Sequence, residues 1–185
     1  MAAVVLVPVK SFREAKLRLA PALPAAERAA LARSMAAKVL AAARPLDAWV
    51  VCDDDEVADW AAAEGAAVLL RPGRGLNGAV ADGVAHLAEA SFDQVIVAHA
   101  DLPLATTLGW LADFDGVTLV PDRHDDGTNV ACVPARGGFE WAYGAGSFAR
   151  HCAEAGRLGL ALRIERDVPL GWDVDVPADL SVLSP

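Results

Sequence analysis

The 185-residue chain has little of what defines several protein classes. Its three cysteines are widely spaced and form no CxxC pair, which argues against a disulfide scaffold or a structural zinc site. Its longest apolar runs, such as residues 2–7 and 95–98, fall far short of the ~20 residues that a membrane-spanning helix needs. No basic segment precedes the first apolar run, so we expect no signal peptide and a cytoplasmic protein.

Positive charge is also scarce, because the formal net charge is −9. Nucleic acids and anionic membranes bind basic surfaces, so neither is an expected partner. The basic residues that are present are unevenly spread, and four of them fall within nine positions: Lys10, Arg13, Lys16 and Arg18. On an acidic protein such a cluster is typical of a site for a small anionic ligand, although a solvated charged loop is the simpler alternative.

What the chain does have is a regular alternation of strand and helix patterns, which predicts a single α/β domain over residues 1–185. We expect three layers, helices on both faces of a mostly parallel sheet. The predicted strands are 3–9, 47–52, 67–70, 94–98, 117–120, 128–133, 160–164 and 172–174. The predicted helices are 24–43, 53–63, 77–90, 106–114, 147–156 and 177–183.

In such sheets, ligands bind beyond the carboxyl ends of the strands. The cationic loop directly follows the first strand, where triphosphate oxygens would need its charges. Asp101 follows the strand 94–98, and Asp173 and Asp175 lie two residues apart near the end of the chain. Carboxylates so placed predict a Mg²⁺ site if the two segments meet, because Mg²⁺ prefers oxygen ligands. The alternative is that they only form turns and caps.

Two glycine-rich turns each precede a predicted helix. In the first, Leu76 and Asn77 follow two glycines, and Asn77 suits either a base or ribose contact or a plain helix cap. In the second, Gly144 leads to Ser147 at a helix start, where free amides favour a phosphate or carboxylate. Ser147 can equally be a simple cap, and Arg150 and His151 beyond it can be ordinary surface residues. No serine lies in a G-x-S-x-G elbow, which argues against serine-hydrolase chemistry.

Taken in order, six segments of the chain carry a resemblance to a known family: VPVK with AKLRL, GLN, ADLPL, PDRHDDGTN, YGAGSFARH and DVDVPADL. Together they resemble the 2-phospho-L-lactate and phosphoenolpyruvate guanylyltransferases, which serve biosynthesis of the deazaflavin coenzyme F-420. The resemblance covers essentially the whole chain. It implies a Rossmann-related, GT-A-like nucleotidyltransferase fold, with GTP and a small phosphorylated carboxylic acid as substrates and Mg²⁺ as cofactor.

The resemblance also implies roles for individual residues. Catalysis falls to Lys16, Asp101 and Asp173, and the metal ligands are Asp101 with Asp173, or Asp175 as the other candidate. The acceptor acid would bind at Thr128, Gly144 and Ser147. The nucleotide would bind at Lys10, Arg13, Lys16, Arg18, Leu76 and Asn77.

A phosphate-bearing acceptor is already nucleophilic, so this reading explains a chain that has carboxylates and a basic loop but no Ser/His or Cys/His dyad. Two alternatives stay open: a MobA-like nucleotidyltransferase with another acceptor, and a non-catalytic GTP-binding relative. Three acceptor acids fit the sequence equally: phosphoenolpyruvate, 2-phospho-L-lactate and 3-phospho-D-glycerate. A monomer and a homodimer are both compatible with it.

Overall fold

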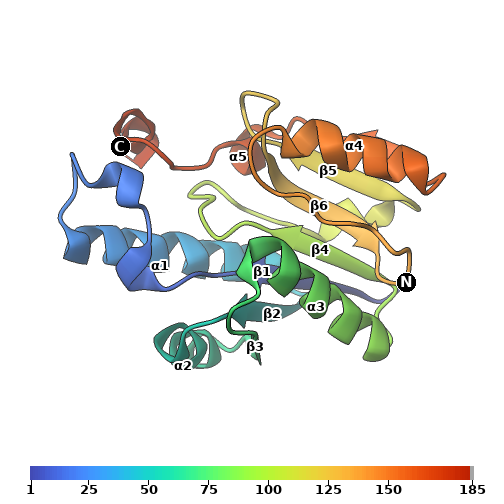
Figure 1. Cartoon of the computed structure of the whole chain (residues 1–185), viewed down its shortest axis with the longest axis horizontal. Helices are drawn as coiled ribbons and strands as arrows, with labels where there is room; N and C mark the ends of the chain where they lie inside the picture. The colour runs from blue at the N-terminus through green and yellow to red at the C-terminus, as the bar shows by residue number, and fades with distance from the viewer. Residues whose placement is uncertain (184–185) are drawn as a thin grey trace.

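The computed structural model describes residues 1–183 and contains a seven-stranded sheet in the order β3-β2-β1-β4-β6-β5-β7 (Figure 1). Strand β6 runs antiparallel to both of its neighbours, β4 and β5, and every other neighbouring pair is parallel. The predicted mostly parallel, mixed sheet is therefore confirmed. The strands are β1 (Ala3–Pro8), β2 (Asp47–Cys52), β3 (Ala67–Leu70), β4 (Gln94–Ala98), β5 (Val117–Pro121), β6 (Thr128–Pro134) and β7 (Leu162–Ile164).

Helices cover both faces of this sheet. The α-helices are α1 (Ala25–Ala43), α2 (Asp55–Ala63), α3 (Gly75–Glu89), α4 (Ser147–Arg157) and α5 (Val168–Gly171). Short 3₁₀ helices are η1 (Phe12–Glu14), η2 (Leu17–Leu19), η3 (Gly109–Asp113) and η4 (Pro177–Leu183). None of the helices within residues 1–183 combines the length and the apolar character that crossing a bilayer would require.

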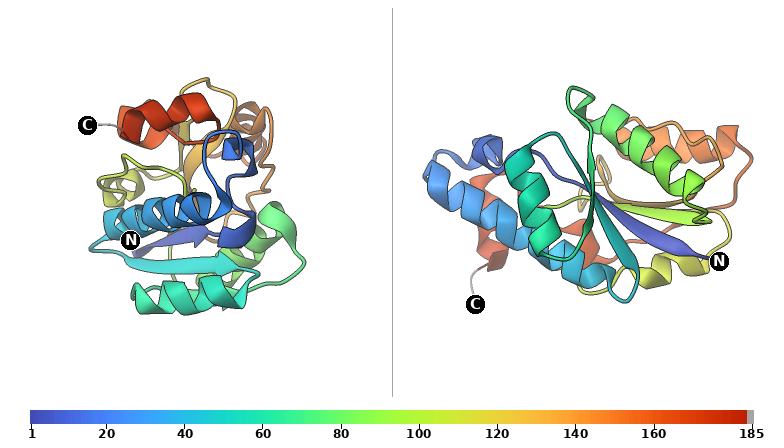
Figure 2. Two further views of the ribbon diagram at one scale, coloured as in Figure 1. Left: turned by 90° about the vertical axis from the view of Figure 1, so that its left-hand side faces the viewer. Right: turned by 90° about the horizontal axis from the view of Figure 1, so that it is seen from below.

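The alternation of side chains along β1 shows how the three layers form. Val5 and Val7 pack into the core on the side of α1 and α2, whereas Val4 and Leu6 pack on the side of α3 (Figure 2). Helix α4 covers the same face as α3, over β5 and β6. Helix α3 approaches β1 closely at Gly83, where an added Cβ would lie only 2.6 Å from Leu6 Cδ2.

Helix starts agree with the sequence prediction to within one or two residues, but two capping roles differ. Asp54 caps α2, because its carboxylate accepts a hydrogen bond from the Val57 amide. Pro24 is the N-cap of α1 rather than its first helical residue. Ser147, expected to be a cap, is instead the first residue of α4, and Gly146 in a left-handed conformation precedes it.

Three predicted elements are wrong in kind, and one of them is the final helix at 177–183, which is the 3₁₀ helix η4. The expected helix at 106–114 is the shorter η3, and the fully buried Leu108 and Leu111 have the three-residue spacing of a 3₁₀ helix. The expected strand at 172–174 does not form a ladder with the sheet. After β7, Asp167 caps the short helix α5 by accepting a hydrogen bond from the Leu170 amide, and residues 172–174 follow this helix outside the sheet.

Candidate functional site

The topology brings three stretches of chain to one edge of the sheet. Strands β1 and β4 are parallel neighbours, so their carboxyl ends lie side by side. Strand β6 runs the opposite way, with Ala98 of β4 opposite Val130, so the beginning of β6 lies at that same edge. This places Thr128, the first residue of β6, beside the residues that follow β4.

A cavity of about 690 Å³ opens at this edge, a size typical of small-molecule sites. Its wall includes the loop after β1, the turn after β4, the start of β6 and the segment before α4. The predicted site residues that line it are Lys10, Lys16, Arg18, Leu76, Asp101, Thr128, Gly144, Ser147, Asp173 and Asp175. Ten of the twelve predicted site residues therefore line one continuous cavity, although they lie far apart in the chain.

Two predicted nucleotide-binding residues lie elsewhere. The exposed Arg13 forms an ion pair with Glu56 of α2, 2.9 Å away, and is not part of the cavity wall. The Asn77 side chain accepts a hydrogen bond from the Tyr143 amide at 2.7 Å, so it fixes the segment before α4 instead of lining the cavity. Its neighbour Leu76 does line the cavity.

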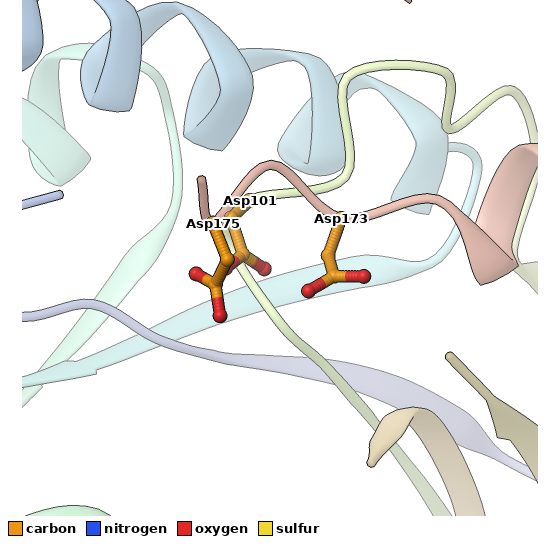
Figure 3. Close-up of side chains that lie close together, drawn as sticks. All are labelled: Asp101, Asp173 and Asp175. Carbon is orange, nitrogen blue, oxygen red and sulfur yellow. The ribbon is translucent and has the colours of Figure 1, made fainter. Parts of the chain in front are cut away.

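Three carboxylates gather at the inner end of the cavity. Asp101, Asp173 and Asp175 each offer an oxygen atom, and these atoms lie within 4.8 Å of one another. Figure 3 shows all three side chains directed toward the same side of the segments that carry them. The late segment is attached to the turn after β4 by a backbone hydrogen bond, from the Val174 amide to the Asp101 carbonyl at 3.3 Å.

The Lys16 ammonium group lies against these carboxylates. Its Nζ is 2.6 Å from Asp101 Oδ2 and 3.1 Å from Asp175 Oδ1. Burial works to lower the pKa of Lys16, but the charges of Asp101 and Asp175 outweigh it and raise the pKa above its ordinary value. Lys16 also has a left-handed backbone (φ 54°, ψ 42°), a conformation that costs a non-glycine residue about 1–2 kcal/mol. These tertiary contacts hold it there.

The carboxylates retain binding capacity for a metal ion. Asp101 Oδ1 is buried and has no hydrogen-bond partner within residues 1–183. Burial and the charges of Asp101 and Asp175 raise the pKa of Asp173, so a further positive charge would stabilise its ionised form. Closely spaced carboxylate oxygens, one of them unpaired, fit a hard divalent cation such as Mg²⁺.

Arg123 and Asp179 support the segment that carries Asp173 and Asp175. Arg123 donates to the Asp173 carbonyl at 3.1 Å, pairs with the Asp179 carboxylate, and lies 4.6 Å from the centre of the Trp172 ring. The other oxygen of Asp179 accepts from the Asp175 amide at 2.7 Å. The sequence analysis overlooked both residues, although they lie within the PDRH and DVDVPADL segments.

Another part of the cavity wall contains two buried hydroxyl residues, Thr128 and Ser147. Thr128 is 2% exposed and Ser147 is 1% exposed, and the Thr128 amide donates to Ser147 Oγ at 3.0 Å. Gly144, with φ of +118°, belongs to the turn that precedes Ser147. This arrangement presents small hydroxyl groups and the start of α4 to the cavity, which suits an anionic group of modest size.

Two aromatic residues of the wall were also missed. His99 and Tyr143 line the cavity with ring centres 4.8 Å apart, and the His99 Nε2 and Tyr143 hydroxyl are buried with no hydrogen-bond partner within the described residues. Tyr143 is the only tyrosine of the chain. The only sequence signal for Tyr143 was its position just before the Gly144 turn, in the YGAGSFARH segment.

Solved structures define the class of protein to which this fold belongs. The chain superposes with a TM-score of 0.78 on a putative nucleotide-diphospho-sugar transferase from Desulfovibrio desulfuricans G20, covering 98% of this chain and 86% of that one at 18% identity. It also matches a CMP-2-keto-3-deoxy-manno-octonic acid synthetase complexed with CTP, with a TM-score of 0.62, 99% and 97% coverage and 13% identity. The fold is thus that of nucleotide-sugar transferases and cytidylyltransferases.

Sequence relatives narrow this class to a family. The family described as guanylyl transferase CofC-like matches residues 3–184. A phosphoenolpyruvate guanylyltransferase of Sphaerobacter thermophilus is 42% identical, with 100% of this chain and 93% of the relative covered. A 2-phospho-L-lactate guanylyltransferase of Methanothermobacter thermautotrophicus is 31% identical, with 95% and 81% covered. The chain belongs to the CofC-like guanylyltransferase family, as the resemblance implied.

Proposed function

We propose that this protein transfers a guanylyl group from GTP to a small phosphorylated carboxylic acid and releases pyrophosphate. The observation that carries the proposal is the cavity itself, which has a carboxylate cluster and a lysine at one end and buried hydroxyl groups at the other. A nucleotidyl transfer needs two different binding regions in one cavity, because one substrate carries a polyphosphate and the other is a compact anion.

The chemistry needs no strong base in the protein. A phosphate oxygen of the acid attacks the α-phosphorus of GTP, the bond to the bridging oxygen of the β-phosphate breaks, and pyrophosphate leaves. Lys10 and Arg18 lie on the cavity wall where cations can neutralise the triphosphate. The Lys16 ammonium group lies beside the carboxylates, and from there it can neutralise negative charge on the triphosphate during the reaction.

We further propose that Asp101, Asp173 and Asp175 hold Mg²⁺. When bound there, the ion would neutralise negative charge on the triphosphate and on the departing pyrophosphate. The unpartnered Asp101 Oδ1 and the raised pKa of Asp173 support this assignment.

Thr128, Ser147 and the Gly144 turn are proposed to bind the acid. Phosphoenolpyruvate is the first candidate, because six relatives that are 31–42% identical are named phosphoenolpyruvate guanylyltransferases, whereas the reported 2-phospho-L-lactate guanylyltransferase is 31% identical. The resulting guanylated product would enter deazaflavin coenzyme F-420 biosynthesis, the role that the family resemblance implies.

The test is pyrophosphate release from GTP and Mg²⁺ in parallel reactions with phosphoenolpyruvate, 2-phospho-L-lactate and 3-phospho-D-glycerate. We expect release with one acid well above the other two, with phosphoenolpyruvate as the favoured substrate, and no release with CTP or ATP as donor. Release with none of the acids, despite tight GTP binding, would contradict the proposal and favour a non-catalytic relative or another acceptor.

A further inference from the structure

His151 lies behind the cavity wall and makes a hydrogen bond with each ring nitrogen. It is 0% exposed, the Ala142 amide lies 3.1 Å from its Nε2, and Thr128 Oγ1 lies 3.0 Å from its Nδ1. His151 itself does not line the cavity, whereas Thr128 does. An ordinary surface residue was the simpler alternative for His151 in the sequence, so both its burial and its partners are findings of the structure.

These two partners fix the tautomer of the ring. A backbone amide can only donate, so His151 Nε2 must be the nitrogen that accepts and carries no proton. The proton of the neutral ring is then on Nδ1, which donates to Thr128 Oγ1. Burial, followed by the neighbouring charge of Arg150, lowers the pKa of His151 to about 4, so the ring is neutral near neutral pH.

Aromatic side chains hold the ring in this orientation. The ring centre of His151 lies 4.9 Å from that of Tyr143, 5.8 Å from Trp141 and 5.6 Å from Phe139. The first two contacts are edge-to-face, an arrangement that aromatic pairs favour. A ring flip would break both hydrogen bonds and disturb this packing.

The hydroxyl protons at the cavity wall are directed as a result. Thr128 Oγ1 accepts a hydrogen bond from His151, and Ser147 Oγ accepts one from the Thr128 amide. One lone pair of each hydroxyl oxygen is therefore already used by a donor of the protein. Among residues 1–183 neither hydroxyl group has an acceptor of its own within hydrogen-bond distance. Each proton is therefore left to donate to a ligand.

We infer that His151 is a positioning residue that fixes the Thr128 hydroxyl as a hydrogen-bond donor to the anionic acceptor substrate. The identity of the substrate in this inference rests on the proposed function. The hydrogen-bond order, meaning which atom donates and which accepts at His151 and Thr128, does not rest on it. A hydroxyl group fixed as a donor favours a ligand that presents acceptor oxygens, and its hydrogen bond to the charged oxygens of a phosphate or carboxylate is stronger than one to a neutral acceptor. The spacing in the sequence agrees, because Ser147 and His151 are four residues apart on one face of α4.

The hydrogen-bond order can be tested without turnover. Nitrogen-15 NMR of the histidine rings distinguishes the two neutral tautomers, and the signals of His151 are identified by their loss in His151→Gln. We expect a proton on Nδ1 and none on Nε2 between pH 6 and pH 8. A proton on Nε2, or a charged ring in that range, would overturn the inference whether or not the protein is a guanylyltransferase.

The role in binding is tested by kinetics. His151→Leu removes the donor to Thr128, and we expect KM for the acid to rise about tenfold, the usual effect of losing a hydrogen bond to a charged group. KM for GTP should change less than twofold. His151→Gln can accept from the Ala142 amide and donate to Thr128, so it should restore most of the affinity. Phe139→Leu alters the same aromatic packing outside the cavity and serves as the matched control.

A double-mutant cycle separates positioning from mere packing. In a Thr128→Val background the hydroxyl is gone, so His151→Leu should raise KM for the acid no further. An equal rise in both backgrounds, or an equal rise from Phe139→Leu, would overturn the inference. If the wild-type protein turns over none of the three acids, the proposed function fails, and the NMR result still decides the hydrogen-bond order.

Discussion

The two parts of the cavity that we propose to bind anions differ in charge and burial. The part proposed for the nucleotide has cationic side chains, several of which face solvent: the Arg18 side chain is 77% exposed and Lys10 is also exposed. The part proposed for the acceptor acid has hydroxyl residues that are almost completely buried, with Thr128 2% and Ser147 1% exposed. We expect the first, exposed end to attract charge and the second, buried end to select a ligand by hydrogen-bond geometry.

This difference has a physical basis. Exposed cations interact through water and salt, so each contributes little and tolerates a ligand that shifts position. Buried hydroxyl groups lose solvent on folding, so a ligand that leaves them unpaired is penalised heavily. We therefore expect discrimination between acids to come from the buried end and general affinity for polyphosphate to come from the exposed end.

Removal of a charge from the carboxylate cluster should have the largest effect. Asp101→Asn keeps the size of the side chain but removes the charge that faces Lys16 and the proposed Mg²⁺. We expect kcat for pyrophosphate release to fall about 1,000-fold or more, the scale on which a preorganised electrostatic group acts. Circular dichroism should show an unchanged fold. Asp115→Asn, at an exposed carboxylate outside the cavity, is the control, and near-normal turnover in Asp101→Asn would contradict the assignment.

The support of the cluster should matter next. Arg123→Gln removes the ion pair with Asp179 and weakens the hold on the Asp173 segment. We expect the Mg²⁺ concentration for half-maximal rate to rise about 10–100-fold, the effect typical of groups that orient metal ligands. Arg166→Gln breaks the exposed pair with Asp125 and should leave the Mg²⁺ requirement unchanged. Equal behaviour of the two variants would show that Arg123 does not position the cluster.

A packing change in the scaffold should alter stability but not the site. Gly83→Ala would place a Cβ 2.6 Å from Leu6 Cδ2, and overpacking of this kind costs about 1–3 kcal/mol of the free energy of unfolding. Gly156→Ala in α4 meets no atom within 4 Å and should stabilise the protein slightly. Chemical denaturation measures both. A stable Gly83→Ala protein would mean that α3 can move away from β1 at little cost.

The exposed end should show the smallest effect of a single change. Arg18→Gln removes a cation that is only loosely paired with Asp175, at 3.5 Å. We expect KM for GTP to rise roughly threefold at low salt, consistent with the small energy of an exposed charge, and less at high salt. KM for the acid should not change. A larger effect on the acid than on GTP would reverse the division between the two ends.

Helices and strands were predictable where local signals were strong. The alternation of apolar runs with helical patterns indicated the sheet, and the predicted start of α4 at Ser147 is confirmed. Prediction failed where tertiary contacts decide the conformation. Lys16 has a left-handed backbone that no local signal favours. Residues 172–174 follow the short α5 and form a hydrogen bond with the turn after β4 instead of joining the sheet.

The sequence alone determined the α/β class and the family. Ten of its twelve predicted site residues line the cavity, because ligands of such sheets bind where strands end and the motifs lie at those points. Only the tertiary structure decided which groups meet. The reversed direction of β6 brings Thr128 to the carboxyl end of β4, and the hydrogen bond of Val174 to Asp101 brings the late carboxylates to the early one. The burial of His151 behind Thr128 also depends on contacts between distant parts of the chain, which local spacing does not encode.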